Sequence, residues 1–400
     1  MSSEKDFFDP AGVGLQVSGV RQSNQRVILT LVTLNPGLSA AELSRRSLLA
    51  PQTVSAIVDD LQQAGLLRAG EVLRGRRGQP ATPYYINGSG AYTIGVEIGW
   101  RHIEATLVNI GGEVLAQYRR DYAAPDPRTI FKELGGVTSQ FIARLPEGEA
   151  KKLIALGIAA PGSIGRNIGL LDNDPELAAR WQGIDIAAAA AEATGLPVQL
   201  FNDGNAACWA ELGTMPQPRP ANYAYLLVST FIAAGIVAEN VLWEGPTGNS
   251  ANLGSMLVSD RNGERNFVHL LASLYALQKR LAAAGITVPD TTPMFWPWED
   301  WEPYVGEWIA DAGDALAKAI INAAAVFEFR DAVVDGVLPQ NILDRLIISV
   351  REGIDVLPML TAESPRVMKG HLGSAAPATG AAYLPLYRRF FSRDLSHLHD

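Results

Sequence analysis

The chain of 400 residues contains a single cysteine, Cys208. One cysteine excludes an internal disulfide and any metal site that needs several cysteine ligands. Long apolar stretches are also missing, since no uninterrupted run reaches the roughly 18 residues that a membrane-spanning helix needs. The N-terminus lacks the charged start and apolar run of a signal peptide. We therefore expect a cytoplasmic protein with no cofactor and no metal site.

Charge is sparse as well, because only 19% of the residues are charged whereas 48% are hydrophobic. This balance indicates compact globular domains, and 400 residues suffice for two or three of them. The net charge of −9 at first argues against a nucleic-acid partner. However, residues 1–90 hold nine Lys/Arg and seven Asp/Glu, a net of +2, so the remainder carries −11. A slightly basic N-terminal segment followed by an acidic remainder is compatible with a DNA-binding protein, because the local basic surface determines the affinity for phosphates.

Residues 39–66 predict a helix-turn-helix. Ser39 and Glu42 have the spacing of a capping box, and Pro51 suits the first position of a second helix. Apolar residues of that helix recur on one face, at Val54, Ile57, Val58 and Leu61. Small and amide side chains near its N-terminus are then exposed and can touch base edges in a major groove: Gln52, Thr53 and Ser55. The alternative is an ordinary helix pair inside a larger domain.

A basic, glycine-flanked loop follows the second helix. Residues 66–86 can form two short strands around this loop, as in the wing of a winged helix-turn-helix. Its arginines can lie along phosphates or enter a minor groove: Arg74, Arg76 and Arg77. A solvated basic loop is the alternative. We expect a flexible arm at 1–19, the winged domain at 20–86 and a linker at 87–91.

The pattern changes after the linker. Residues 92–215 alternate between strand-like and helix-like runs, beginning with a hairpin that turns at Gly111-Gly112. Residues 216–400 begin again with a strand and a second series of helices. Such a repeat of hairpin-led β/α segments predicts two α/β lobes, at 92–215 and 216–400, with a cleft between them.

Several segments, in this order, resemble the ROK repressors (repressor, open reading frame, kinase). The winged part and the hairpin YTIGVEIGWRHIEATLVNIGGEVL match the first half of that family. The body matches it in LGIAAPGSI, FNDGNAACWAELG, GNSANLGSM and HLGSAAPATGAAYL. The resemblance implies an actin-like or sugar-kinase-like body of two lobes that binds a sugar-like effector between them.

The chain departs from the family's kinases in both phosphate loops. The kinases hold phosphates with an Asp-x-Gly-Gly-Thr turn, whereas this chain has Glu97-Ile98-Gly99-Trp100-Arg101. Their second loop is rich in glycine, but residues 229–234 read STFIAA, whose bulk is expected to fill a nucleotide site. The family's zinc site needs a histidine where Ser255 stands, followed by cysteines that are missing here.

The resemblance also assigns an effector site. Asn202 and Asp203 match the pair that hydrogen-bonds sugar hydroxyls in the family, and Asn252 replaces its glutamate. The full expected set is Pro161, Gly162, Asn202, Asp203, Asn252 and Ser255. From the residues alone, the segment at 202–204 is equally a strand-to-helix turn in which Asn202 or Asp203 caps the helix.

The expected function is that of a DNA-binding transcriptional regulator, a repressor of carbohydrate uptake or catabolism genes. Its expected partners are double-stranded operator DNA, a small sugar-like effector and a second copy of the chain, as a homodimer or higher homo-oligomer. Two alternatives remain open. One is a carbohydrate kinase with an added DNA-binding domain, and the other is a regulator whose body has lost effector binding.

Overall fold

A computed structural model describes residues 17–72, 81–162, 164–165, 168–169, 174–216, 218–357 and 363–391. The described residues form two compact units. The first contains residues up to Gly90 together with 388–391, and the second runs from Ala91 to Tyr387. No helix of the described residues has the length and apolar character required to cross a bilayer.

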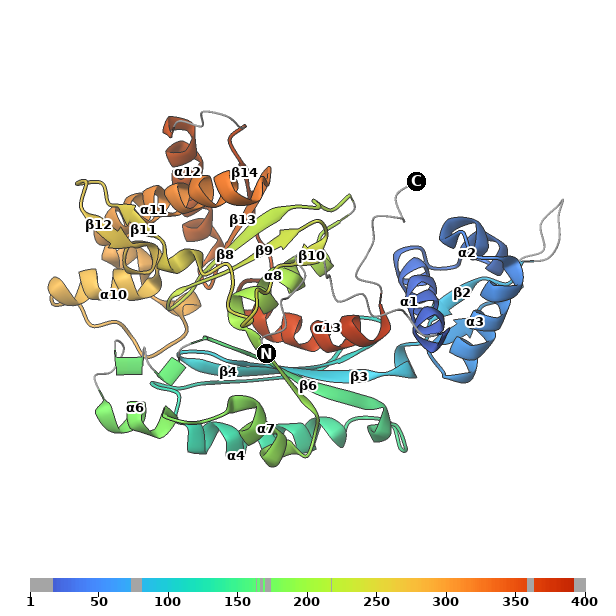
Figure 1. Ribbon diagram of the computed structural model, residues 1–400. Helices are drawn as coiled ribbons and strands as arrows, with labels where there is room; N and C mark the ends of the chain where they lie inside the picture. Colours follow the sequence, from blue (N-terminus) through green and yellow to red (C-terminus); the bar gives the residue numbers. More distant parts are fainter. Residues whose placement is uncertain are drawn as a thin grey trace, which may run out of the picture. The chain divides into compact units, whose positions relative to one another are not determined.

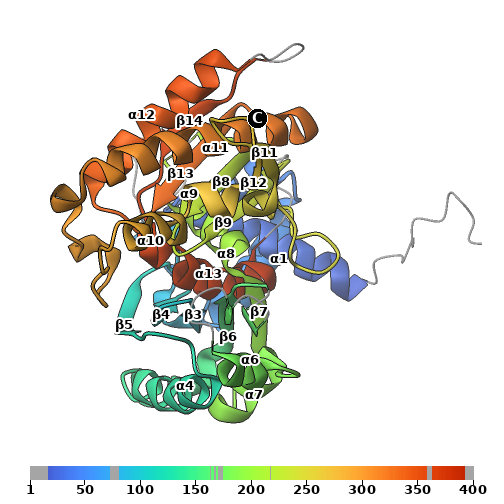
Figure 2. The same cartoon turned by 90° about the vertical axis from the view of Figure 1, so that its left-hand side faces the viewer.

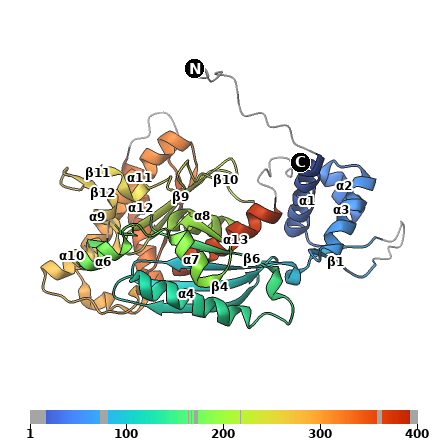
Figure 3. The ribbon, with the colours of Figure 1, turned by 60° about the horizontal axis from the view of Figure 1, so that its bottom comes forward.

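The first unit is a three-helix domain with a small two-stranded sheet, and it contains the predicted helix-turn-helix (Figure 3). Its elements are α1 (Val17–Leu34), α2 (Ala40–Ser47), α3 (Pro51–Gln63), β1 (Leu67–Ala69) and β2 (Tyr84–Ile86). Each helix contacts the other two, and β1 pairs with β2 antiparallel. Ile28, Leu43 and Val54, one from each helix, are fully buried at the centre. The apolar face predicted for α3 is thus the face that closes this core.

Local interactions define where α2 and α3 begin. The Ser39 amide donates to the Glu42 carboxylate at 2.8 Å, and the Glu42 amide donates back to the Ser39 hydroxyl at 3.4 Å, so the capping box is present. Pro51 opens α3. Between the helices, Leu48 has a left-handed backbone (φ 57°) and is 87% exposed. The Ser44 hydroxyl donates to the Leu49 carbonyl at 2.7 Å and holds this turn.

The second unit contains two five-stranded sheets of the same design (Figure 1). The first sheet has the order β5-β4-β3-β6-β7. Strands β5, β4 and β3 pair antiparallel, whereas β3, β6 and β7 pair parallel. Its strands are β3 (Tyr92–Ile98), β4 (His102–Asn109), β5 (Val114–Asp121), β6 (Leu153–Ala160) and β7 (Val198–Asn202). One face is covered by α4 (Pro127–Ile142), α6 (Pro175–Trp181) and α7 (Ile186–Thr194), which contribute to its core (Figure 3).

The second sheet has the order β10-β9-β8-β13-β14 and repeats this pairing pattern. Its strands are β8 (Tyr223–Val228), β9 (Ile232–Ala238), β10 (Val241–Leu242), β13 (Asp331–Gly336) and β14 (Arg366–Lys369). Strand β13, which lies between β8 and β14, is not predicted from the sequence. Its apolar run, Ala332 to Val334, is only three residues long and is flanked by aspartates. Burial between two parallel partners makes it a strand, and that burial is not a local property of the sequence.

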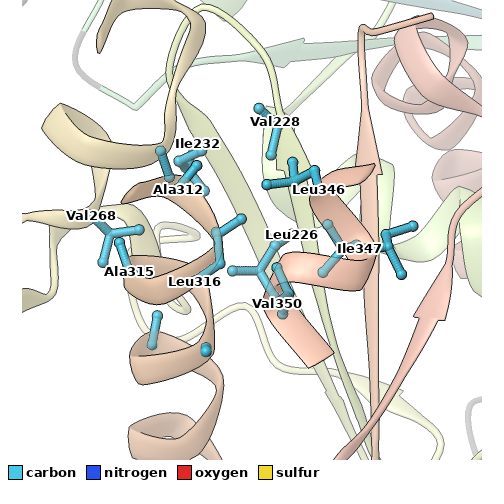
Figure 4. Close-up of a cluster of buried hydrophobic side chains, with 14 of the residues drawn as sticks. Leu226, Val228, Ile232, Val268, Ala312, Ala315, Leu316, Leu346, Ile347 and Val350 are labelled. Carbon is cyan, nitrogen blue, oxygen red and sulfur yellow. The ribbon is translucent and has the colours of Figure 1, made fainter. Parts of the chain in front are cut away.

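Helices cover the outer face of the second sheet: α9 (Val268–Ala272), α10 (Leu274–Ala283), α11 (Tyr304–Phe327) and α12 (Gln340–Val356). Figure 4 shows Leu316 of α11 and Leu346 and Val350 of α12 packed beside Leu226 of β8. Ser273 separates α9 from α10, and its hydroxyl accepts from the Ala276 amide to cap α10. A small hairpin of β11 (Leu257–Ser259) and β12 (Arg265–Phe267) precedes α9.

Two helices, α8 (Asp203–Thr214) and α13 (Ala376–Phe390), lie between the sheets (Figure 2). The hydroxyl of Thr93 in β3 donates to the Ala382 carbonyl of α13 at 2.7 Å. A Cβ at Gly380 would lie 1.8 Å from the Ala206 carbonyl oxygen of α8, so only glycine permits this crossing. The last helix therefore contacts the first sheet and also shares a buried cluster with strands of the second sheet. The fold, with two α/β lobes after an N-terminal helix-turn-helix and its small sheet, is as predicted.

Candidate functional site

The N-terminal end of α3 presents the side chains expected to read DNA. Gln52, Thr53 and Ser55 are exposed, whereas Val54 and Ile57 on the other face of the helix are buried. The helix is therefore anchored by one face and offers short polar groups on the other, which is the arrangement of a recognition helix. Arg74, Arg76 and Arg77 of the expected wing lie outside the described residues.

All six expected effector-site residues line one small cavity in the second unit, with a volume of about 130 Å³. Pro161 and Gly162 follow β6, and Asn202 and Asp203 join β7 to α8. Asn252 and Ser255 come from the segment before β11, and their side chains form no hydrogen bond with any described residue. The ends of two parallel strands thus meet a loop of the second lobe, at a position where open α/β folds bind ligands.

Asn202 has the structural role that was considered as the alternative. Its Oδ1 accepts from the amides of Gly204 (3.0 Å) and Asn205 (3.2 Å), which caps α8. Its Nδ2 donates to Oδ1 of Asn249 at 3.2 Å, and Asn249 also lines the cavity. Most of the Asn202 amide is therefore occupied by the protein itself, and its role is to position α8 and the loop at Asn249.

Asp203 is the cavity residue with the most perturbed acidity. Its Oδ1 accepts from the Gly204 amide at 2.9 Å, which leaves Oδ2 without a donor among the described residues. Burial, together with the nearby charge of Glu97, raises the pKa of Asp203 to about 7. Near neutral pH the carboxyl therefore exists in both forms, an acceptor when ionised and a donor when protonated. A carboxyl of this kind in a cavity is typical of a functional site.

Asp203→Asn is expected to stabilise the ligand-free protein at alkaline pH. Because the folded-state pKa lies above the unfolded value, Asp203 contributes stability at low pH that is lost as pH rises toward about 7. Asparagine resembles the protonated form at every pH. At 1.36 kcal/mol per pKa unit, and allowing for solvent at Asp203, we expect a gain on the order of 2 kcal/mol at pH 8. Urea unfolding at pH 8 and pH 4 measures it, and equal gains at both values would contradict the assignment.

His269 was not expected in the site, although it lines the same cavity. Its Nδ1 accepts from the Ile232 amide at 3.1 Å, and burial lowers the pKa of His269 to about 4. The ring is therefore neutral and carries its proton on Nε2, which becomes a fixed donor for a ligand. The ring meets Phe231 edge to face at 5.7 Å. No spacing in the sequence connects His269 with the six predicted residues, because tertiary packing alone brings it there.

Gly254 makes room for this histidine. A Cβ at Gly254 would lie 2.2 Å from the His269 ring, so Gly254→Ala must displace it. We expect a loss of about 1–3 kcal/mol in the free energy of unfolding, which is typical of overpacking. His269→Ala in the same chain should recover most of that loss. Gly136→Ala is the matched control, because a Cβ there meets nothing within 4 Å. Equal stabilities for Gly254→Ala and Gly136→Ala in urea unfolding would disprove the contact.

Trp100 and Phe231 form an aromatic wall of the small cavity. Both come from the segments that the family resemblance matches to the kinases' phosphate loops, and their rings meet edge to face at 5.2 Å. Beyond Trp100 lies a second, larger cavity of about 280 Å³. Phe231, the largest side chain of residues 229–234, packs against Trp100 and Tyr275 and does not fill this second cavity. Ser229 and Thr230 consequently line an open space.

Comparison with known proteins agrees with both units. Residues 93–387 match the ROK family, and residues 19–78 match the MarR family. The xylose repressor of Bacillus spizizenii is 27% identical over 66% of this chain and 68% of its own. A solved ROK family transcriptional regulator, a homologue of the E. coli MLC protein, covers 95% of this chain and 99% of its own, at 21% identity and a TM-score of 0.68. A ROK hexokinase from Thermus thermophilus covers 74% and 99%, at 23% identity and a TM-score of 0.53. Because the ROK match spans well over half of the sequence, the chain belongs to the ROK family.

Proposed function

We propose that the chain is a DNA-binding transcriptional regulator, a repressor of carbohydrate uptake or catabolism genes, whose operator affinity responds to a sugar-like effector. One observation supports this most: the same chain carries a helix, α3, with exposed polar side chains at its N-terminal end and, in its other unit, a small polar cavity. The relative named a xylose repressor supports the carbohydrate part of the proposal. The solved regulator matches both units in fold, whereas the hexokinase covers 74% of the chain.

The small cavity suits an uncharged polyhydroxyl ligand. Asn252, Ser255 and His269 offer neutral donors and acceptors, and Asp203 is the only acidic residue among the described residues that line it. Those lining residues include no lysine or arginine. Its volume of about 130 Å³ is well above the roughly 10–15 Å³ that a cavity needs to hold one water molecule, so it has room for a small ligand such as one sugar ring. A ligand bound there changes operator affinity only by its differential affinity for two conformations, typically about 1–3 kcal/mol or roughly 5–150-fold.

On DNA the regulator is proposed to act as a two-fold dimer on a roughly palindromic site, because one winged domain has a small footprint. Genome-wide mapping of bound DNA in the native host tests this proposal. Sites with two-fold symmetry beside sugar transport or catabolic genes are expected. Bound sites without any shared sequence would contradict specific regulation.

We further propose that the chain is not a sugar kinase. Asp203 is placed to act as a base, but Trp100 and Phe231 occupy the loops that would orient and neutralise a transferred phosphoryl group. Incubation with ATP, magnesium and common hexoses, pentoses or amino sugars should therefore yield no more sugar phosphate than the Asp203→Asn variant. Turnover above that control would restore the kinase alternative.

The remaining alternative is a body that has lost effector binding, and the occupied amide of Asn202 is the observation in its favour. Calorimetry over a panel of sugars, polyols and sugar acids distinguishes the two possibilities, because a ligand of the native state also raises its stability. A panel without any binding would favour this alternative.

A further inference from the structure

The larger cavity adjoins the small one, since Trp100 and Asp203 line both. Its volume of about 280 Å³ is roughly twice that of the small cavity. A ligand that fills the small cavity and contacts Asp203 therefore has open space beyond it, on the side of Trp100.

Two cationic side chains that line the larger cavity, Arg119 and His102, are paired with carboxylates. Arg119 donates to Glu104 at 2.8 Å and forms an ion pair with Asp121 at 3.0 Å. His102 lies 3.1 Å from Glu97; burial lowers the pKa of His102, but the Glu97 carboxylate more than compensates, so that pKa is raised. A phosphate group in this space would have to compete with these carboxylates for its cations.

The acidic groups also outnumber the cations that line the space. The acidic lining residues are Glu97, Asp121, Asp203 and Asp290, and the cationic ones are Arg101, His102 and Arg119. Arg101 donates to the Ala123 carbonyl. The lining therefore offers a phosphate group no surplus of positive charge, which disfavours a nucleotide or a sugar phosphate.

Four uncharged polar side chains face this space without a hydrogen-bond partner among the described residues: Thr230, Gln278, Thr291 and Ser374. Each hydroxyl or amide both donates and accepts, as a sugar hydroxyl does. Apolar walls accompany them, chiefly Trp100 and Trp296. Trp296 is held in place by its Nε1, which donates to the Thr291 carbonyl at 3.0 Å, and by Trp298 at 5.6 Å. Apolar walls with a few convergent polar groups are typical of ligand sites.

We propose that the two cavities form one effector site for a neutral ligand larger than a monosaccharide: a disaccharide or a glycoside. One ring occupies the small cavity beside Asp203, and the second unit lies in the larger cavity, within reach of Gln278. This inference rests on the proposed function and specifies its effector class.

Calorimetry with the full-length protein tests it on matched pairs of sugars: xylose with xylobiose, glucose with cellobiose and maltose, and galactose with lactose and melibiose. At least one disaccharide is expected to bind ten times more tightly than its monosaccharide. Gln278→Ala should lower the affinity for that disaccharide about fivefold, the equivalent of about one hydrogen bond. The affinity for the monosaccharide should not change. Gln182→Ala, an exposed glutamine outside both cavities, is the matched control and should change neither.

Four results would contradict the proposal of one site for a disaccharide or a glycoside. Monosaccharides that bind as tightly as their disaccharides, or a Gln278→Ala variant that weakens both equally, would confine the effector to the small cavity and leave the proposed function intact. ATP or glucose 6-phosphate binding more tightly than every neutral sugar would exclude an uncharged occupant. Absence of binding by every sugar would contradict both the extension and the proposed effector response.

Discussion

Replacing Gln52 and Thr53 together by alanine is expected to abolish most of the preference for operator over unrelated DNA. Both side chains are exposed at the N-terminal end of α3, while the buried face of the helix anchors it in the core. A good base contact contributes about 1–3 kcal/mol of discrimination, so two contacts correspond to roughly 30-fold or more. Binding to unrelated DNA should change little, because it depends on phosphate contacts.

Gln63→Ala provides the matched control for this prediction. Gln63 is exposed on the same helix but at its opposite end. The Gln63→Ala variant should have the same preferred DNA sequence and the same operator affinity as wild type. Fluorescence anisotropy with operator and scrambled duplexes measures both quantities. An unchanged sequence preference in the Gln52/Thr53 variant would show that another element reads the bases.

The wing arginines should give a different result. Replacing Arg76 and Arg77 by alanine is expected to lower the affinity of the protein for operator DNA and for scrambled DNA to a similar degree. The slope of log affinity against log salt should fall by about one for each arginine that no longer neutralises a phosphate. If the variant lost sequence preference without a change in salt slope, these arginines would contact bases rather than phosphates.

Asp203→Ala is expected to lower affinity for the effector by roughly 10–150-fold. A hydrogen bond to a charged group contributes about 1.5–3 kcal/mol, and Oδ2 of Asp203 is available to ligand hydroxyls. Asp355→Ala is the matched control, because Asp355 is exposed on α12 and lies outside both cavities. Calorimetry with the tightest sugar of the panel measures the effect. Equal effector affinities of Asp203→Ala and wild type would show that the effector does not bind at Asp203.

The same carboxyl predicts a pH dependence of ligand affinity. Hydroxyl donors require the ionised form, and the pKa of Asp203 is about 7. Apparent affinity falls with the fraction of competent protein, so it should drop about tenfold between pH 8 and pH 6. His269 contributes no change in this range, because its pKa is lowered to about 4. A constant affinity between pH 8 and pH 6 would show that Asp203 does not accept from the ligand in its ionised form.

The sequence predicted best what is determined locally. The capping box at Ser39 and Glu42 and the apolar stripe of α3 are properties of short segments, and both are present. The six predicted cavity residues are separated by up to 94 positions, from Pro161 to Ser255, and were grouped by family resemblance rather than by spacing. Their grouping around one cavity is a structural observation, and their binding of an effector is still a prediction.

What the sequence did not reveal depends on tertiary contacts. Strand β13 is defined by burial between β8 and β14, and its short apolar run carries little signal. His269 enters the cavity because Gly254 leaves room for its ring and the Ile232 amide orients it. The bulk of Phe231 is evident from the sequence, but the direction of its ring is not, so the larger cavity was not predicted.

The central claim is that one chain couples a sugar-like ligand in the body to operator binding by the winged unit. The most direct measurement is the affinity of the full-length protein for a mapped operator duplex, with and without saturating sugar, in wild type and in Asp203→Ala. The account predicts that sugar changes the wild-type affinity by roughly 5–150-fold. Asp203→Ala should bind the operator equally well without sugar and should not respond at the same sugar concentration. An operator affinity in wild type that is the same with and without saturating sugar would contradict the account.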